Sequence, residues 1–98
     1  MFIINYKETI TNDDGVKNKN FGTKNVAFNN KKDAIARIYN ITDGIMNEFL
    51  DELDDECCYR EANDSGDWQK VVVNNKTTDN DYYEYWISEI DIIEGENK

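Results

Sequence analysis

Apolar and polar residues alternate with a period of two from Phe2 to Ile10. Because successive side chains of a strand point to opposite faces of a sheet, this alternation predicts a half-buried strand. The segment Asn12–Gly15 that follows is typical of a turn, with Asp-Gly as its strongest signal. A second strand is expected over 24–28, after a polar stretch at 16–23 that we expect to be weakly structured. The first part of the chain therefore predicts a hairpin with an irregular middle.

The period then changes to that of a helix. Asn29 or Asn30 can cap a helix that begins near Lys31. At ~100° per residue, one continuous arc contains Ile35, Ile38, Thr42, Ile45, Met46, Phe49, Leu50 and Leu53. The opposite arc contains Glu48, Asp51, Glu52 and Asp55. This pattern predicts an amphipathic helix, with a kink or break near Gly44 because glycine is costly inside a helix.

The second half of the chain contains two expected strands. A loop is expected over 61–67, followed by a short strand over 68–74 and a polar, turn-like segment over 74–81. The last strand is expected over 82–93, with a bulge at Ser88–Glu89 that returns its apolar residues to one face.

The implied order is strand, strand, helix, strand, strand. We therefore predict an α+β fold in which an antiparallel sheet of three to four strands packs against one long or kinked amphipathic helix. The chain of 98 residues is expected to form a single domain over 1–98, with a frayed tail at 94–98.

Charge is distributed unevenly along the chain. Residues 1–41 carry seven basic residues and four acids, whereas residues 42–98 carry four basic residues and seventeen acids. The formal net charge is −10, which disfavours direct binding to nucleic acid or to anionic membranes. The start of the chain has no pattern of a signal peptide, and no run is long enough to span a bilayer. We expect a cytoplasmic protein.

Residues that support catalysis are scarce. Histidine is absent, neither Ser65 nor Ser88 lies in a nucleophile motif, and the five glycines are scattered. We therefore expect no enzymatic activity and no cofactor. Cys57 and Cys58 are expected to be reduced thiols, and a redox role for them stays open.

The acids could instead bind a metal ion. Asn63, Ser65 and Asp67 match the first three ligand positions of an EF-hand loop, but the required glycine and final glutamate are missing. Two adjacent thiols without histidine cannot complete a zinc site. No metal is expected, and a nonstandard divalent site is the alternative.

Carboxylates on one helix face lie roughly 5–6 Å apart, which is comparable to the spacing of phosphates along a nucleic-acid strand. A rigid row of them could occupy a groove that normally binds phosphates. The alternative is that the run is only the solvated face of an amphipathic helix. An aromatic-acidic segment near the last strand could extend the surface, since tyrosine and tryptophan dominate many interfaces. The candidate partner-binding residues are Glu48, Asp51, Glu52, Asp54, Asp55, Glu56, Glu61, Asp64, Asp67, Asp79, Asp81, Tyr82 and Glu84.

With its short length, its acidic block from Glu48 to Asp67 and its acidic-aromatic segment from Asp79 to Trp86, the chain resembles the small acidic phage-encoded inhibitors of host defence. These include anti-CRISPR proteins and other DNA mimics. The resemblance implies a stoichiometric inhibitor that occludes the basic DNA- or RNA-binding channel of a partner such as a CRISPR-associated nuclease. The alternative is a small protein-interaction module, a homodimer or an adaptor, that uses an edge strand or the exposed residues of the aromatic strand, Tyr82, Tyr85 or Trp86.

Overall fold

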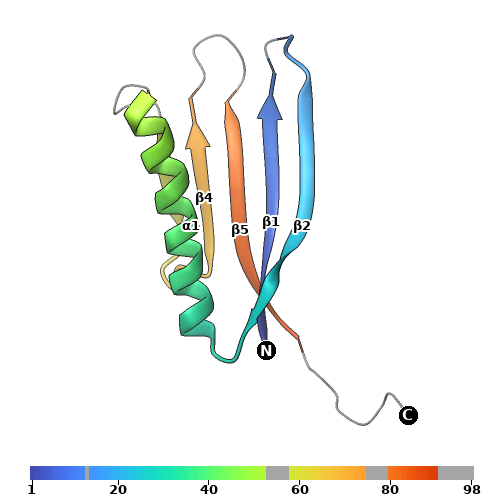
Figure 1. Cartoon of the computed structure of the whole chain (residues 1–98), viewed down its shortest axis with the longest axis vertical. Helices are drawn as coiled ribbons and strands as arrows, with labels where there is room; N and C mark the ends of the chain where they lie inside the picture. The colour runs from blue at the N-terminus through green and yellow to red at the C-terminus, as the bar shows by residue number, and fades with distance from the viewer. Residues whose placement is uncertain (13, 53–57, 75–79, 91–98) are drawn as a thin grey trace, which may run out of the picture.

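The described part of the chain forms five strands and one helix (Figure 1). The computed structural model describes residues 1–12, 14–52, 58–74 and 80–90, without the side chains of 49–52. The elements are, in chain order, β1 (Phe2–Thr11), β2 (Lys17–Phe28), α1 (Lys31–Glu52), β3 (Cys58–Ala62), β4 (Trp68–Val73) and β5 (Asp81–Glu89).

All five strands belong to one antiparallel sheet with the order β2-β1-β5-β4-β3. The first and last strands pair at its centre, with Tyr6 opposite Tyr85. β2 and β3 are the two edges, and α1 contacts every strand of the sheet. Figure 1 shows α1 in front of the β4 side of the sheet, running roughly along the strands.

The predicted fold class is wrong in the number and order of the strands. The sheet has five strands rather than three to four, and the order is β-β-α-β-β-β rather than β-β-α-β-β. The additional strand is β3, which was not predicted; its last two residues fall in the loop expected over 61–67. Its backbone pairs with β4 from Cys58 opposite Val73 to Ala62 opposite Gln69. Backbone hydrogen bonds therefore define this strand, and they leave little trace in a hydrophobic pattern.

The other strand boundaries also differ from those predicted. β2 begins at Lys17 rather than near Lys24, because its pairing with β1 continues up to Thr11 opposite Lys17. β5 pairs with β1 without a register shift as far as Glu89, so the bulge predicted at Ser88–Glu89 is not found there. The predicted continuation of this strand over 91–93 lies outside the described residues, as does the tail at 94–98.

The helix begins where the sequence predicts. Asn30 caps it, because its side-chain oxygen accepts a hydrogen bond from the backbone N–H of Asp33 at 2.9 Å and its amide donates to the Asp33 carboxylate at 3.0 Å. The helix then continues through Gly44 without a break to Glu52. Among the described side chains of its apolar arc, Ile38, Ile45 and Met46 pack in the clusters between the helix and the sheet.

The core lies between α1 and the face of the sheet that it covers. Ile4 of β1, Ile38 of α1 and Tyr85 of β5 form one buried cluster, and Cys58, Val71 and Val73 form a second one beneath Ile45 and Met46. Tyr85 is only 2% exposed, so it cannot serve as the outward-facing aromatic residue considered above.

A polar junction also joins the helix to the sheet. The Thr42 hydroxyl, fully buried, lies 3.0 Å from the side-chain oxygen of Gln69, whose amide donates to the carbonyl oxygen of Gly66 at 2.9 Å. Arg60 of β3 donates to the Thr42 hydroxyl at 3.2 Å and forms an ion pair with Asp43. Because buried polar groups are costly unless they are hydrogen-bonded, this junction favours one placement of α1 over the sheet.

Candidate interaction surfaces

The face of the sheet opposite α1 is a candidate interaction surface, called the open face below. No helix or strand of the described residues packs on it. Directly opposed residues of neighbouring strands share one face, so the register assigns the side chains to rows across the sheet. Two such rows contain Tyr59, Val72, Tyr82, Thr9 and Lys19, and then Glu61, Lys70, Glu84, Lys7 and Phe21.

Side-chain contacts agree with this assignment. The indole N–H of Trp68 donates to the Glu84 carboxylate at 2.7 Å. The Lys70 ammonium lies 4.9 Å from the centre of the Tyr82 ring, and the Lys7 ammonium lies 5.7 Å from that of Phe21. Both lysines therefore form cation–π contacts with aromatic rings. Among the described residues neither lysine forms an ion pair.

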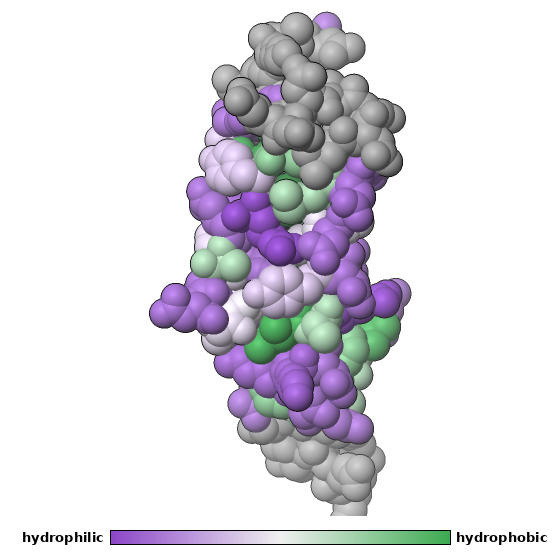
Figure 2. All heavy atoms as spheres, turned by 90° about the vertical axis from the view of Figure 1, so that its left-hand side faces the viewer, coloured by the Kyte–Doolittle hydropathy of each residue, from purple (hydrophilic) through white to green (hydrophobic). Residues whose placement is uncertain are grey.

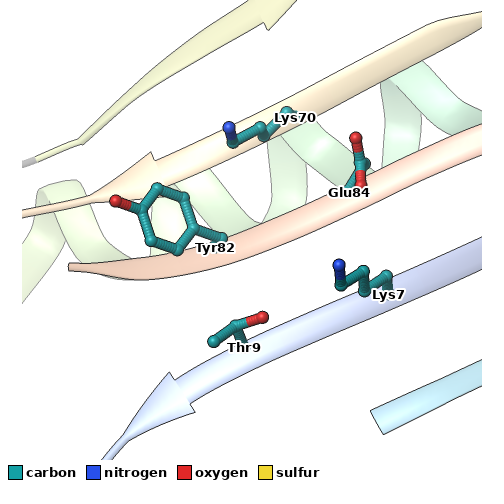
Figure 3. A pocket seen from close by; sticks show the side chains of 5 residues that line it. All are labelled: Lys7, Thr9, Lys70, Tyr82 and Glu84. Atoms are coloured by element: carbon teal, nitrogen blue, oxygen red, sulfur yellow. The ribbon is translucent and has the colours of Figure 1, made fainter. Parts of the chain in front are cut away.

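A shallow hollow of about 210 Å³ lies in the middle of the open face. Figure 3 shows its five lining side chains on β1, β4 and β5, with α1 behind the sheet. They are Lys7, Thr9, Lys70, Tyr82 and Glu84. The candidate residues Tyr82 and Glu84 thus belong to a surface that also carries lysines, which the sequence analysis did not single out.

The second candidate surface is an acidic end of the molecule, formed where α1 ends. Glu48 is exposed there, Asp51 and Glu52 belong to the last turn, and this turn contains no basic residue. The C-terminus of a helix carries a partial negative charge that favours cations. The acids are therefore placed where they cost stability, by roughly 0.3–1 kcal/mol each at exposed positions.

The environment of Tyr83 shows that carboxylates from other elements gather at the same end. Burial, as the largest cause, together with the negative charges of Asp81, Glu8 and Glu48, raises the pKa of Tyr83 to about 12. These three carboxylates come from β5, β1 and α1. Asp81 also accepts a hydrogen bond from the backbone N–H of Thr11 at 2.8 Å. The acidic end is therefore assembled by the tertiary fold from distant parts of the sequence.

The remaining predicted residues lie elsewhere. Glu61 is on the open face of β3, and the exposed Asp64 lies with Asp67 in the turn between β3 and β4. Lys31, the first residue of α1, contacts Asp67, so this turn lies near the beginning of the helix rather than near its acidic end. Asp54, Asp55, Glu56 and Asp79 lie outside the described residues.

Asp67 has a structural contact that explains its position. Its carboxylate lies 2.8 Å from the Lys31 ammonium and accepts a hydrogen bond from Asn63. These hydrogen bonds, with that from Lys31 as the largest cause, lower the pKa of Asp67 from 3.8 to about 2. The folded state therefore gains stability from the ionised carboxylate above pH 3.8, and this gain is lost as the pH falls through about 2.

Replacing Asp67 by asparagine should lower the free energy of unfolding at pH 7 by about 1 kcal/mol, because a partly exposed, solvent-screened ion pair and the hydrogen bonds to the carboxylate are lost. Urea titrations at pH 7 and at steps between pH 4 and pH 2 measure this effect, and the variant should show a flatter decline in that acid range. Asp64→Asn in the same turn is the control and should change stability by less than about 0.5 kcal/mol. Equal stabilities of D67N and D64N at pH 7 would contradict the assignment.

Other kinds of site find little support within the described ranges. Residues 1–12, 14–52, 58–74 and 80–90 contain no group of three or more histidine, cysteine or acidic residues placed to hold a metal ion. The helix of the same part of the chain is not apolar enough over its length to cross a membrane. Figure 2 shows mostly hydrophilic spheres on the side of the molecule that carries α1 and β3, with hydrophobic ones in small separate areas.

No protein-family model matches the chain, and neither a curated protein nor a solved structure matches it.

Proposed function

We propose that the protein is a non-enzymatic inhibitor whose acidic end occupies the phosphate-binding channel of a basic nucleic-acid-binding protein, such as a CRISPR-associated nuclease. The observation that supports this proposal most directly is the placement of Glu48, Asp51 and Glu52 at the C-terminal end of α1, without a basic residue in the last turn. Acids at this position destabilise the helix, so a contribution to binding gives a physical reason for them.

The geometry of the helix supports the same proposal. Glu48 and Glu52 are four residues apart on α1, and Asp51 is three residues from Glu48. Residues at these spacings are neighbours on one face of a helix, roughly 5–6 Å apart. A groove that binds phosphates could receive such a row and release its counterions. Asp81 and Glu8 add negative charge at the same end, as the pKa of Tyr83 indicates. Association would be accelerated by the long-range field and slowed by salt.

The test is a competition experiment with the double variant Glu48→Gln, Glu52→Gln. Purified guide-loaded CRISPR nucleases are titrated with the protein in the presence of a labelled target duplex, at several salt concentrations. The native protein should displace the duplex at near-stoichiometric amounts from a susceptible nuclease, and the double variant should need at least about tenfold more, because it lacks two charges of the row. Its helix should be as stable as the native one or more stable, because like charges and an unfavourable dipole contact are removed.

A matched control removes two charges elsewhere. Asp64→Asn, Glu89→Gln produces the same change in net charge at two exposed residues outside the acidic end, and it should inhibit as the native protein does. Equal potency of the two double variants would show that position on α1 is irrelevant. Failure of the native protein to displace the duplex from any nuclease tested would remove the proposal.

A further inference from the structure

The row of residues through the middle of the open face alternates in charge. Across β3, β4, β5 and β1 it reads, in order, Glu61, Lys70, Glu84 and Lys7. The signs are therefore negative, positive, negative, positive. When a second copy of this row is laid against the first in reverse order, every negative charge faces a positive one.

We propose that the open face is the interface of a homodimer, in which two copies pack face to face about a two-fold axis that runs parallel to the strands between β4 and β5. This axis reverses the row in the second copy. Lys70 then faces Glu84 of the second copy, and Glu61 faces its Lys7, each pair occurring twice as an isologous interface requires. The row is called the charge ladder below.

The rows on either side of the charge ladder fit the same axis. Trp68 is opposite Trp86 within the sheet, and Val72 is opposite Tyr82. Since these pairs also straddle β4 and β5, the axis places Trp68 over Trp86 of the second copy. Val72 is only 1% exposed in its own chain, so Tyr82 makes the contact in that row. Aromatic side chains therefore lie above and below four ion pairs, an arrangement typical of interface centres that contain tryptophan and tyrosine.

The dimensions are suitable for this packing. Facing sheets lie about 10 Å apart, a distance that a lysine and a glutamate pointing toward each other can bridge. The axis sets β3 and β4 of one copy over β1 and β5 of the other, and β3 and β4 have five and six residues. At about 3.4 Å per residue and about 4.8 Å between strands, each copy contributes roughly 350 Å², which makes this a small interface of the kind that weak complexes use.

The state of the charges within one chain supports the proposal. Neither Lys7 nor Lys70 has an ion-pair partner among the described residues, and Glu84 accepts its hydrogen bond from an indole. Their charges are therefore available to a second copy. The net charge of −10 on each chain opposes association, but α1 lies on the outer side of each sheet. The two helices are then separated by both sheets, which is well beyond the Debye length of about 8 Å at physiological salt.

The experiment exploits the complementarity of two single variants. Lys70→Glu places like charges opposite each other in a homodimer, because the introduced carboxylate then faces Glu84 of the second copy. Glu84→Lys does the same with the opposite sign. Each variant alone should dimerise at least about tenfold more weakly than the native protein in sedimentation equilibrium. A mixture of the two variants restores opposite charges at every position of the charge ladder, so the mixture should form a heterodimer with near-native affinity.

A second pair of variants guards against a folding defect, since Glu84→Lys also removes the hydrogen bond from Trp68. Lys7→Glu and Glu61→Lys change the outer pairs of the charge ladder. Each of these variants should also dimerise weakly by itself, and the two should form a heterodimer when they are mixed. Lys24→Glu is the control, because Lys24 lies near Tyr6 and Tyr85 on the side of the sheet that α1 covers, and this variant should dimerise as the native protein does. Circular dichroism verifies that each variant is folded.

A native protein that is monomeric at millimolar concentration would overturn the proposal. A dimer that survives Lys70→Glu and Lys7→Glu, or mixtures that associate no better than their components, would also overturn it and would point to an edge strand instead. The inference is independent of the proposed inhibition, because the acidic end and the open face are different surfaces. Competition with a labelled duplex can fail while the dimer forms, and the reverse is equally observable.

Discussion

Replacing Tyr85 by alanine should destabilise the protein strongly, whereas replacing Tyr82 by alanine should have a much smaller effect. Tyr85 is 2% exposed and packs with Ile4 and Ile38 between α1 and the sheet. Removing such a ring costs about 3–5 kcal/mol, which is a large part of the 5–15 kcal/mol that stabilises a typical domain. Tyr82 belongs to the half-buried open face, so its replacement leaves no cavity in the core.

Urea unfolding followed by tryptophan fluorescence measures both effects. Tyr85→Phe retains the ring and should keep most of the native stability, which separates packing from the loss of the hydroxyl. The comparison tests the register of β5 directly, because a slip by one residue exchanges the two faces of the strand. A larger loss in Y82A than in Y85A would mean that the assigned faces are reversed.

The second large effect is expected in alkali. Burial raises the pKa of both Tyr83 and Tyr85, that of Tyr83 to about 12, from the ordinary value of 10.0. The unfolded chain therefore releases these protons near pH 10, while the folded protein retains them until a higher pH. The stability contributed by the two neutral phenols is present below pH 10 and is lost as the pH rises through 12.

Each pKa unit corresponds to about 1.4 kcal/mol. Ionisation of these two tyrosines in the unfolded chain can therefore lower the free energy of unfolding by several kcal/mol by pH 12. Equilibrium unfolding in urea at steps from pH 8 to pH 12 should show this decline. The double variant Tyr83→Phe, Tyr85→Phe should show a smaller decline over the same range, because phenylalanine has no proton to release. Since lysines also titrate in this range, the difference between the two proteins is the informative quantity. Parallel pH profiles for the native and double-variant proteins would contradict the assigned burial.

Some of the structure follows from local patterns alone. The side chains of Asn30 and Asp33 determine where α1 begins, and the arc that contains Ile38 and Thr42 determines which side of the helix is buried. The alternation around Ile4 determines one face of β1. These features could be predicted because neighbours in sequence establish them.

Other features could not be predicted in this way. β3 was not predicted because its pairing with β4 depends on backbone hydrogen bonds. The first half of β2 was not predicted because it is a strand only through its pairing with β1, which continues to Thr11 opposite Lys17. For the candidate surfaces, the sequence pattern suggested Tyr82 and Glu84 as candidates but gave no reason to join them with Lys7 and Lys70. The alternation within β1 and β4 contained part of that signal, since Lys7 and Lys70 lie on the side opposite the apolar residues, but the register across strands was unknown.

The sequence by itself determined the elements whose pattern is local: a capped amphipathic helix, a half-buried first strand, and a strong excess of acids after residue 41. Only the tertiary structure decided how these charges are grouped. β1 and β5, from opposite ends of the chain, pair at the centre of the sheet and bring Lys7 beside Glu84 and Glu8 beside Tyr83. Such groupings depend on strand order and register, which are selected by packing and backbone pairing over the whole sheet.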